Sequence, residues 1–129
     1  MRFPKYFPKG CPPADSSEAS GTFYRTIKGR IPLKKDFLPY WLLKPHKQQE
    51  WIQKGKACQA CGLSLNTNIE DLKRKQEIIP SIRGKIAKGT LEPKTGKIKS
   101  TPSLRDTSHH TWWVPDSIKD PSIFFKVVA

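Results

Sequence analysis

Proline is spread along the whole of this sequence and limits what the chain can fold into. Twelve prolines and eight glycines occur among its 129 residues. Proline lacks a backbone donor and clashes inside a helix, so the regular elements between prolines must be short. Long helices and a coiled coil are excluded, and many ordered turns are expected. A chain of this length fits one domain and can bury a core without cross-links.

Hydrophobic periodicity predicts strands and helices in mixed order. Residues 22–28 alternate between two faces and predict the first strand. Residues 69–79 carry apolar side chains at helical spacing and end before Pro80, which predicts the best-defined helix. Further helices are expected at 37–43 and 46–54, and further strands at 62–65, 85–91, 97–100, 110–114 and 123–128. This order predicts an α+β fold with a small, largely antiparallel sheet and two or three short helices.

The first 21 residues have the composition of an irregular arm. Prolines interrupt residues 4–13, and residues 16–21 are rich in small and polar side chains. Aromatic side chains at Phe3, Tyr6 and Phe7 could hold the arm on the rest of the protein. We therefore expect a Pro-rich N-terminal arm at 1–21 and a single α+β domain at 22–129.

Positive charge is the strongest signal in the composition. Twenty-four Lys and Arg face eleven Asp and Glu, which gives a net charge of +13. Residues 73–105 hold ten basic and two acidic side chains, a net +8, whereas residues 101–129 carry three of each. A cationic region favours an acidic partner, either nucleic acid or an acidic protein. A solvated surface that keeps the protein soluble is the alternative.

A predicted β-hairpin carries the basic side chains that we expect to contact nucleic acid. Strands 85–91 and 97–100 would pair through a turn at 92–96, with glycines next to lysines. The expected contacts are Arg83, Lys85, Lys88, Lys97 and Lys99, with Trp112 stacking on unpaired bases. This pattern favours a small basic binding module without catalysis, and an exposed hairpin without a partner is the alternative.

The cysteines suggest a metal site. Cys58 and Cys61 form a CxxC pair followed by glycine, a spacing that can hold one Zn²⁺. Cys11 and His109 or His110 could complete the ligands, so a structural zinc site would consist of Cys11, Cys58, Cys61 and His110. In a structural or scaffold protein, the zinc ion would link the N-terminal arm at Cys11 to Cys58 and Cys61. A single CxxC pair favours free or buried thiols with no cofactor over zinc, and three cysteines is an odd number for a secreted disulfide scaffold.

A small enzyme is the second functional hypothesis. His110 would act as acid or base on a phosphodiester, Arg25 would hold phosphate, and Ser64 would position the substrate. On a strand, His109 and His110 point to opposite faces, so only one of them can enter a given site. The corresponding activity is that of a toxin-like ribonuclease or ADP-ribosyltransferase. A structural role for these side chains is the alternative.

Membrane insertion and secretion are not expected. No apolar run approaches the roughly 20 residues that span a bilayer. The first residues, Met1 to Lys5, have no apolar stretch behind them, so a secretory leader is not expected and the cytoplasm is the predicted location.

Several short motifs carry a resemblance. Phe23-Tyr24-Arg25, the run from Cys58 to Ser64, and His110-Thr111-Trp112-Trp113 resemble a group of small uncharacterised bacterial proteins, a resemblance that implies no particular activity. A more distant resemblance is to the ADP-ribosyltransferase fold. It implies Tyr24-Arg25 on an aromatic-Arg strand and Leu63-Ser64 on a Ser-bearing strand, while no glutamate follows Glu92 to take the catalytic place. A shared fold would not fix the function.

Overall fold

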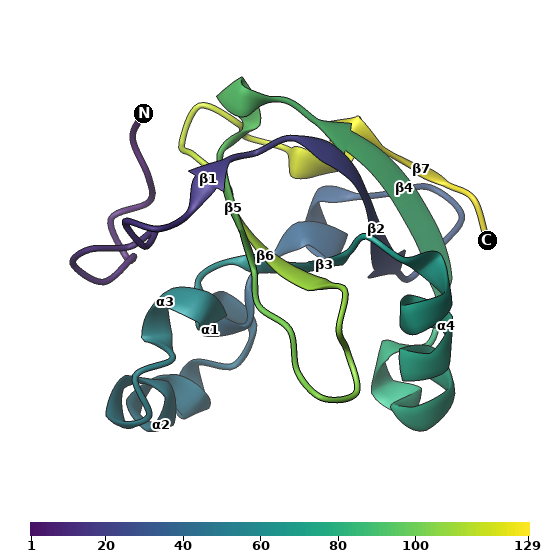
Figure 1. The fold of residues 1–129 in the computed structure, drawn as a ribbon, viewed down its shortest axis with the longest axis horizontal. Helices are drawn as coiled ribbons and strands as arrows, with labels where there is room; N and C mark the ends of the chain where they lie inside the picture. Colours follow the sequence, from purple (N-terminus) through teal and green to yellow (C-terminus); the bar gives the residue numbers. More distant parts are fainter.

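The computed structural model describes residues 1–129 and confirms an α+β fold with one antiparallel sheet (Figure 1). Seven strands lie in the order β1-β5-β6-β3-β2-β4-β7, and every neighbouring pair is antiparallel. The strands are β1 (Ser17–Glu18), β2 (Gly21–Ile27), β3 (Leu63–Asn66), β4 (Lys85–Leu91), β5 (Lys97–Ser100), β6 (His109–Trp113) and β7 (Phe125–Val127).

The sheet curls back on itself at its N-terminal strands. β1 and β2 are almost consecutive in the chain, yet β1 pairs with β5 while β2 lies between β3 and β4. Two adjacent segments can occupy distant places in the strand order only if the sheet is rolled (Figure 1). Gly21, with φ at 115°, lies where the chain passes from one pairing to the other, in a conformation that favours glycine.

The core lies on the inner face of the rolled sheet. Alternate residues of the strands, among them Phe23, Leu65 and Phe125, pack around Trp112, whose side chain is 0 % exposed. The indole N–H of Trp112 donates to the carbonyl of Thr95 at 2.9 Å, which satisfies its only polar atom. One aromatic side chain therefore organises much of the small core.

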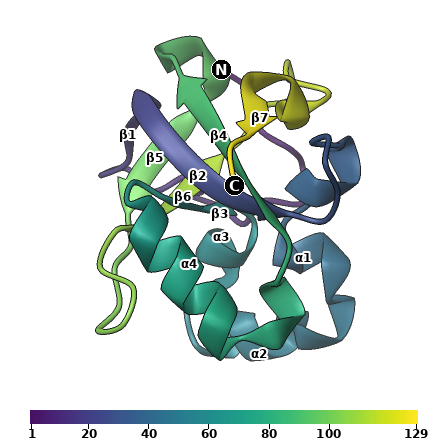
Figure 2. The ribbon, with the colours of Figure 1, turned by 90° about the vertical axis from the view of Figure 1, so that its right-hand side faces the viewer.

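Four short α-helices lie on one side of β3 (Figures 1 and 2). They are α1 (Tyr40–Leu43), α2 (Gln48–Gln53), α3 (Ala57–Ala60) and α4 (Ile69–Ile78). α4 begins at Asn68, whose side chain accepts from the backbone N–H of Glu70 at 2.8 Å. Single 3-10 turns make up the rest: η1 (Lys34–Phe37), η2 (Pro45–Lys47), η3 (Pro80–Ile82), η4 (Pro93–Thr95) and η5 (Pro121–Phe124). Four of these five turns begin at a proline, as the pre-set φ of proline favours.

The N-terminal arm is tied to the rest of the chain in two places. Its end enters the sheet as β1, and the adjoining Ala19 is 0 % exposed. Earlier in the arm, Cys11 forms a disulfide with Cys58 of α3, 47 residues away in the sequence. Phe7 also stacks on Phe3 within the arm, with ring centroids 5.7 Å apart.

The expected hairpin of β4 and β5 is wrong. The two strands are close in the sequence, but β6, β3 and β2 separate them in the sheet. β4 pairs with β2 and β7, while β5 pairs with β1 and β6. Glu92 to Gly96 therefore form a crossing connection rather than a hairpin turn.

Candidate functional site

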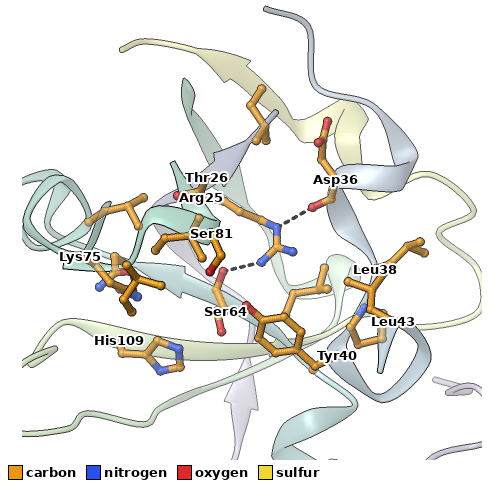
Figure 3. A pocket seen from close by; sticks show the side chains of 18 of the residues that line it. Arg25, Thr26, Asp36, Leu38, Tyr40, Leu43, Ser64, Lys75, Ser81 and His109 are labelled. Carbon is orange, nitrogen blue, oxygen red and sulfur yellow. Dashed lines mark hydrogen bonds between the residues drawn. The ribbon is translucent and has the colours of Figure 1, made fainter. Parts of the chain in front are cut away.

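A cavity of about 640 Å³ opens on the outer face of the sheet (Figure 3). Its wall is the polar side of β2, β3 and β6, where alternation places Ser64, Asn66 and His109 opposite to the core. α4 and η3 bound one side, and η1, α1, η2 and α2 bound the other. A recess of this size can take a nucleotide-sized ligand.

Arg25 brings its guanidinium to the cavity from the core side of β2. β2 and β3 pair only at Tyr24 and Asn66, so beyond that point the strands leave a gap. In this gap, Arg25 donates from Nη1 to the carbonyl of Ser64 at 2.8 Å and from Nε to the carbonyl of Asp36 at 3.0 Å (Figure 3). The guanidinium carbon also lies 5.3 Å from the centroid of the Phe37 ring.

No carboxylate neutralises Arg25. The carboxylate of Asp36 accepts instead from the backbone N–H of Leu33 at 2.9 Å and of Lys28 at 3.1 Å, and no ion pair within 4 Å includes Arg25. Burial lowers the pKa of Arg25 to about 10, while Tyr40 and Asp36 act in the opposite direction. Arg25 therefore stays charged at neutral pH, held by two backbone carbonyls and without an ion pair.

The cavity as a whole is strongly cationic. Six basic side chains line it against two acidic ones: Arg25, Lys28, Lys35, Lys44, Lys47 and Lys75 face Asp36 and Asp106. Only one of the lysines, Lys75, is in an ion pair, with Asp106 at 2.6 Å. A recess lined by one sign of charge concentrates the field and attracts anions.

A buried polar network holds the α4 side of the cavity. Asn66 is 1 % exposed and donates from Nδ2 to the carboxylate of Asp106 at 2.6 Å and to Ser108 Oγ at 3.0 Å. Lys75 reaches from α4 to the Asn66 Oδ1 at 3.1 Å. Because these groups satisfy one another, they form a rigid wall rather than free ligands.

His109 contributes an imidazole to the wall of the cavity. Its Nδ1 lies 3.0 Å from the carbonyl of Thr101 and 2.8 Å from the Thr101 hydroxyl. Burial, and secondarily the charge of Lys75, lower the pKa of His109 below its ordinary value of 6.5, while Asp106 opposes this shift. The imidazole is therefore largely neutral at pH 7.

Aromatic side chains lie along the other side of the cavity. Tyr40 and Trp51 line it from α1 and α2, and the Trp51 ring stacks on Trp41 with centroids 6.3 Å apart. The ammonium of Lys44 lies 4.9 Å from the centroid of the Tyr40 ring. Cations and partly exposed aromatic rings are thus combined at one site.

The structure brings together two of the three residues expected of an enzyme. Arg25 and Ser64 both line the cavity, and the guanidinium of Arg25 binds the carbonyl of Ser64. His110 lies outside it, on the core face of β6, with its ring 5.5 Å from that of Phe23. The histidine of the cavity is His109, one residue earlier on the strand.

The residues expected to contact nucleic acid do not form the predicted hairpin surface. Lys85 and Lys88 lie on β4, Lys97 and Lys99 lie on β5, and the amino group of Lys99 is 2.8 Å from Asp15. Arg83 donates to the carbonyl of Gln76 near the end of α4. The expectation that Trp112 stacks on bases is wrong, because its ring is fully buried in the core.

The zinc expectation is also corrected. Cys11 and Cys58 are joined in a disulfide, so neither offers a thiolate, and no group of three or more His, Cys, Asp or Glu side chains could hold a metal. His110 lies with Phe23, and its Nδ1 is 2.9 Å from the carbonyl of Ser108. Cys61 is 3 % exposed, and burial raises the pKa of its thiol to about 12, which makes it unreactive.

Comparisons with known proteins assign no class to this site. The chain matches no family model, no curated protein and no solved structure. The resemblances to small bacterial proteins and to the ADP-ribosyltransferase fold therefore stay predictions. None of the helices combines the length and the apolar character that crossing a membrane requires.

Several residues of the cavity could not be predicted from the sequence. Lys47, Trp51 and Lys75 come from helical segments that carried no motif, and Tyr40 was assigned only to a helix. Their signal in the sequence is weak, because a basic or aromatic residue on a short helix is common on any protein surface. Only the contact between distant segments shows that these side chains share a site.

Proposed function

We propose that this protein is a binding module for an acidic partner, and that the partner is single-stranded nucleic acid held in the cationic cavity. The observation that carries the proposal is the guanidinium of Arg25, which faces the cavity and has no carboxylate partner. A largely buried charge without an ion pair is costly, and the guanidinium fork matches the geometry of a phosphate as well as that of a carboxylate.

The surroundings of Arg25 favour a nucleic acid over other polyanions. Lys28, Lys35, Lys44 and Lys47 are without ion pairs and could follow a phosphate backbone into and out of the recess. Tyr40 and Trp51 offer partly exposed rings on which unpaired bases can stack. An acidic protein would use the cations but would gain little from stacking. The proposed site uses side chains of the chain alone and includes no cofactor.

The proposal is tested by fluorescence anisotropy with a labelled single-stranded RNA of about 20 nucleotides, a length chosen to exceed single-site sizes of 4–16 nucleotides. Arg25→Gln is expected to weaken binding by about 10- to 100-fold, because it removes a charged hydrogen-bond donor from the site. Arg83→Gln, outside the cavity, is the matched control and should change affinity by less than about twofold.

Salt dependence supplies the second measurement. If about four phosphates are neutralised, affinity should fall by about 50-fold between 50 and 200 mM salt. The slope of log affinity against log salt gives the number of neutralised phosphates, and Arg25→Gln should lower this number by about one. Equal losses for Arg25→Gln and Arg83→Gln would place the contact elsewhere. No binding of single strands at low salt would end the proposal, and preference for an acidic protein over RNA would replace the partner.

The predicted cytoplasmic location can be tested through the Cys11–Cys58 bond. Disulfides persist in oxidising compartments and are rare in the reducing cytoplasm. Rapid alkylation in cells followed by mass spectrometry should find both thiols free if the protein works in the cytoplasm. A fully oxidised pair would point to an oxidising compartment instead.

A further inference from the structure

His109 is held in a way that the binding of an anion does not require. A backbone carbonyl can only accept, so the 3.0 Å contact with the carbonyl of Thr101 assigns the proton to Nδ1. The Thr101 hydroxyl also contacts Nδ1, at 2.8 Å, and is itself held by the Thr111 hydroxyl at 2.9 Å. Nε2 is then the unprotonated nitrogen, and no hydrogen bond of the chain uses it.

The imidazole lies in the same recess as the phosphate-binding groups. Figure 3 shows the His109 ring below Ser64, with the guanidinium of Arg25 and the ring of Tyr40 around the same space. The depressed pKa described above leaves Nε2 free of a proton at neutral pH, as a general base requires. A positioned base and a cation for the phosphoryl oxygens are two of the parts that phosphodiester transfer uses.

The chain does not supply an activated nucleophile. Ser64 lines the cavity, but its Oγ makes no hydrogen bond with His109, and the Thr101 hydroxyl contacts Nδ1 rather than Nε2. A substrate that carries its own nucleophile fits this arrangement, and the ribose 2′-hydroxyl of RNA lies next to the phosphodiester that it attacks.

We propose that the cavity cleaves RNA, with His109 as the base that activates the ribose 2′-hydroxyl. This inference rests on the proposed function, because RNA must first bind in the cavity. Nε2 takes the 2′-hydroxyl proton, the 2′-oxygen forms a bond to phosphorus, and the bond from phosphorus to the 5′-oxygen breaks. The leaving oxygen takes a proton from water, and the imidazolium returns its proton to solvent. The products are a 2′,3′-cyclic phosphate and a 5′-hydroxyl, and Arg25 stabilises the charge on the phosphoryl oxygens during transfer.

The test uses the full chain with a 5′-labelled RNA and the matching DNA, which lacks the 2′-hydroxyl. RNA should give fragments ending in a 2′,3′-cyclic phosphate, identified by mass spectrometry, and DNA should bind without cleavage. His109→Asn should lower the cleavage rate by at least about 100-fold and leave RNA affinity within about threefold. His110→Asn, the same change one residue later on the core face, is the matched control and should keep most of the activity.

Chemical rescue separates a base from a structural role. Free imidazole should restore part of the cleavage by His109→Ala, and circular dichroism should show that each variant is folded. RNA that binds but is never cleaved, equal activity of wild type and His109→Asn, or cleavage of DNA would overturn the inference while leaving the binding proposal in place. Absence of RNA binding would remove both.

Discussion

β3 and β6 present two faces of opposite character from alternate residues of the same two strands. On the inner face, Leu65 and Trp112 are both 0 % exposed and belong to one continuous core. On the outer face, Ser64 and His109 line a cationic cavity. Between the adjacent residues His109 and His110, the side of the strand alone decides which faces a ligand and which packs on Phe23. In this fold, a residue's face is more informative about its role than its type.

The largest difference between the two faces should appear in stability. Trp112→Ala removes the central side chain of the core and should lower the free energy of unfolding by about 3–5 kcal/mol. Trp51→Ala makes the same change at the cavity, where the ring is partly exposed and stacks on Trp41, and should cost no more than about 1.5 kcal/mol. Urea unfolding followed by circular dichroism measures both. Equal losses would show that the cavity side is as tightly packed as the core.

Much of the inner face could be predicted from the sequence. Strands β2 to β7 and helix α4 were predicted close to their observed positions. They could be predicted because alternation of apolar residues, helical spacing and flanking prolines are local patterns. The pairing of β1 with β5 and the disulfide between Cys11 and Cys58 could not be read in this way. Both join segments that are far apart in the sequence, and no local pattern specifies such a partner.

The candidate site was only partly predictable. Arg25 and Ser64, which the sequence predicts as phosphate-holding and substrate-positioning residues, both line the cavity. The choice between two adjacent histidines could not be made, because shifting the register by one residue exchanges the faces and both residues are polar. The remaining walls come from short helices and 3-10 turns, whose positions the strand pattern cannot predict.

Removing the Cys11–Cys58 disulfide tests how much the stability of the outer, cavity-bearing side depends on its link to the N-terminal arm. It joins the arm to α3, next to the helices that form one wall of the cavity, and closes a loop of 47 residues. Cys11→Ser with Cys58→Ser should lower the free energy of unfolding by about 2–4 kcal/mol, chiefly because the unfolded chain gains freedom. Urea unfolding with and without a reductant measures the effect.

Cys61→Ala is the control for the disulfide variant, since this cysteine is buried and unbonded. It should cost about 1 kcal/mol or less, and a reductant should not change its stability further. If reduction leaves the wild type as stable as before, the Cys11–Cys58 bond contributes nothing to the stability of the outer side. The comparison of the two faces would then concern the sheet and helices alone.

The smallest expected effect is a dependence of stability on pH that arises from His109. Its folded pKa is lowered below the ordinary value of 6.5, so folding favours the neutral imidazole. This contribution is complete above pH 6.5 and is lost as the pH falls through the lower folded pKa. Burial is the main cause of the lowered pKa; Lys75 and His110 lower it further, while Asp106 and the hydrogen bond to the Thr101 carbonyl raise it. His109→Asn should remove this part of the acid sensitivity in urea titrations at several pH values, and Lys75→Met should raise the His109 pKa measured by NMR. An unchanged acid sensitivity in His109→Asn would mean that the outer face is open enough to hydrate the imidazolium, which would weaken the contrast with the core face.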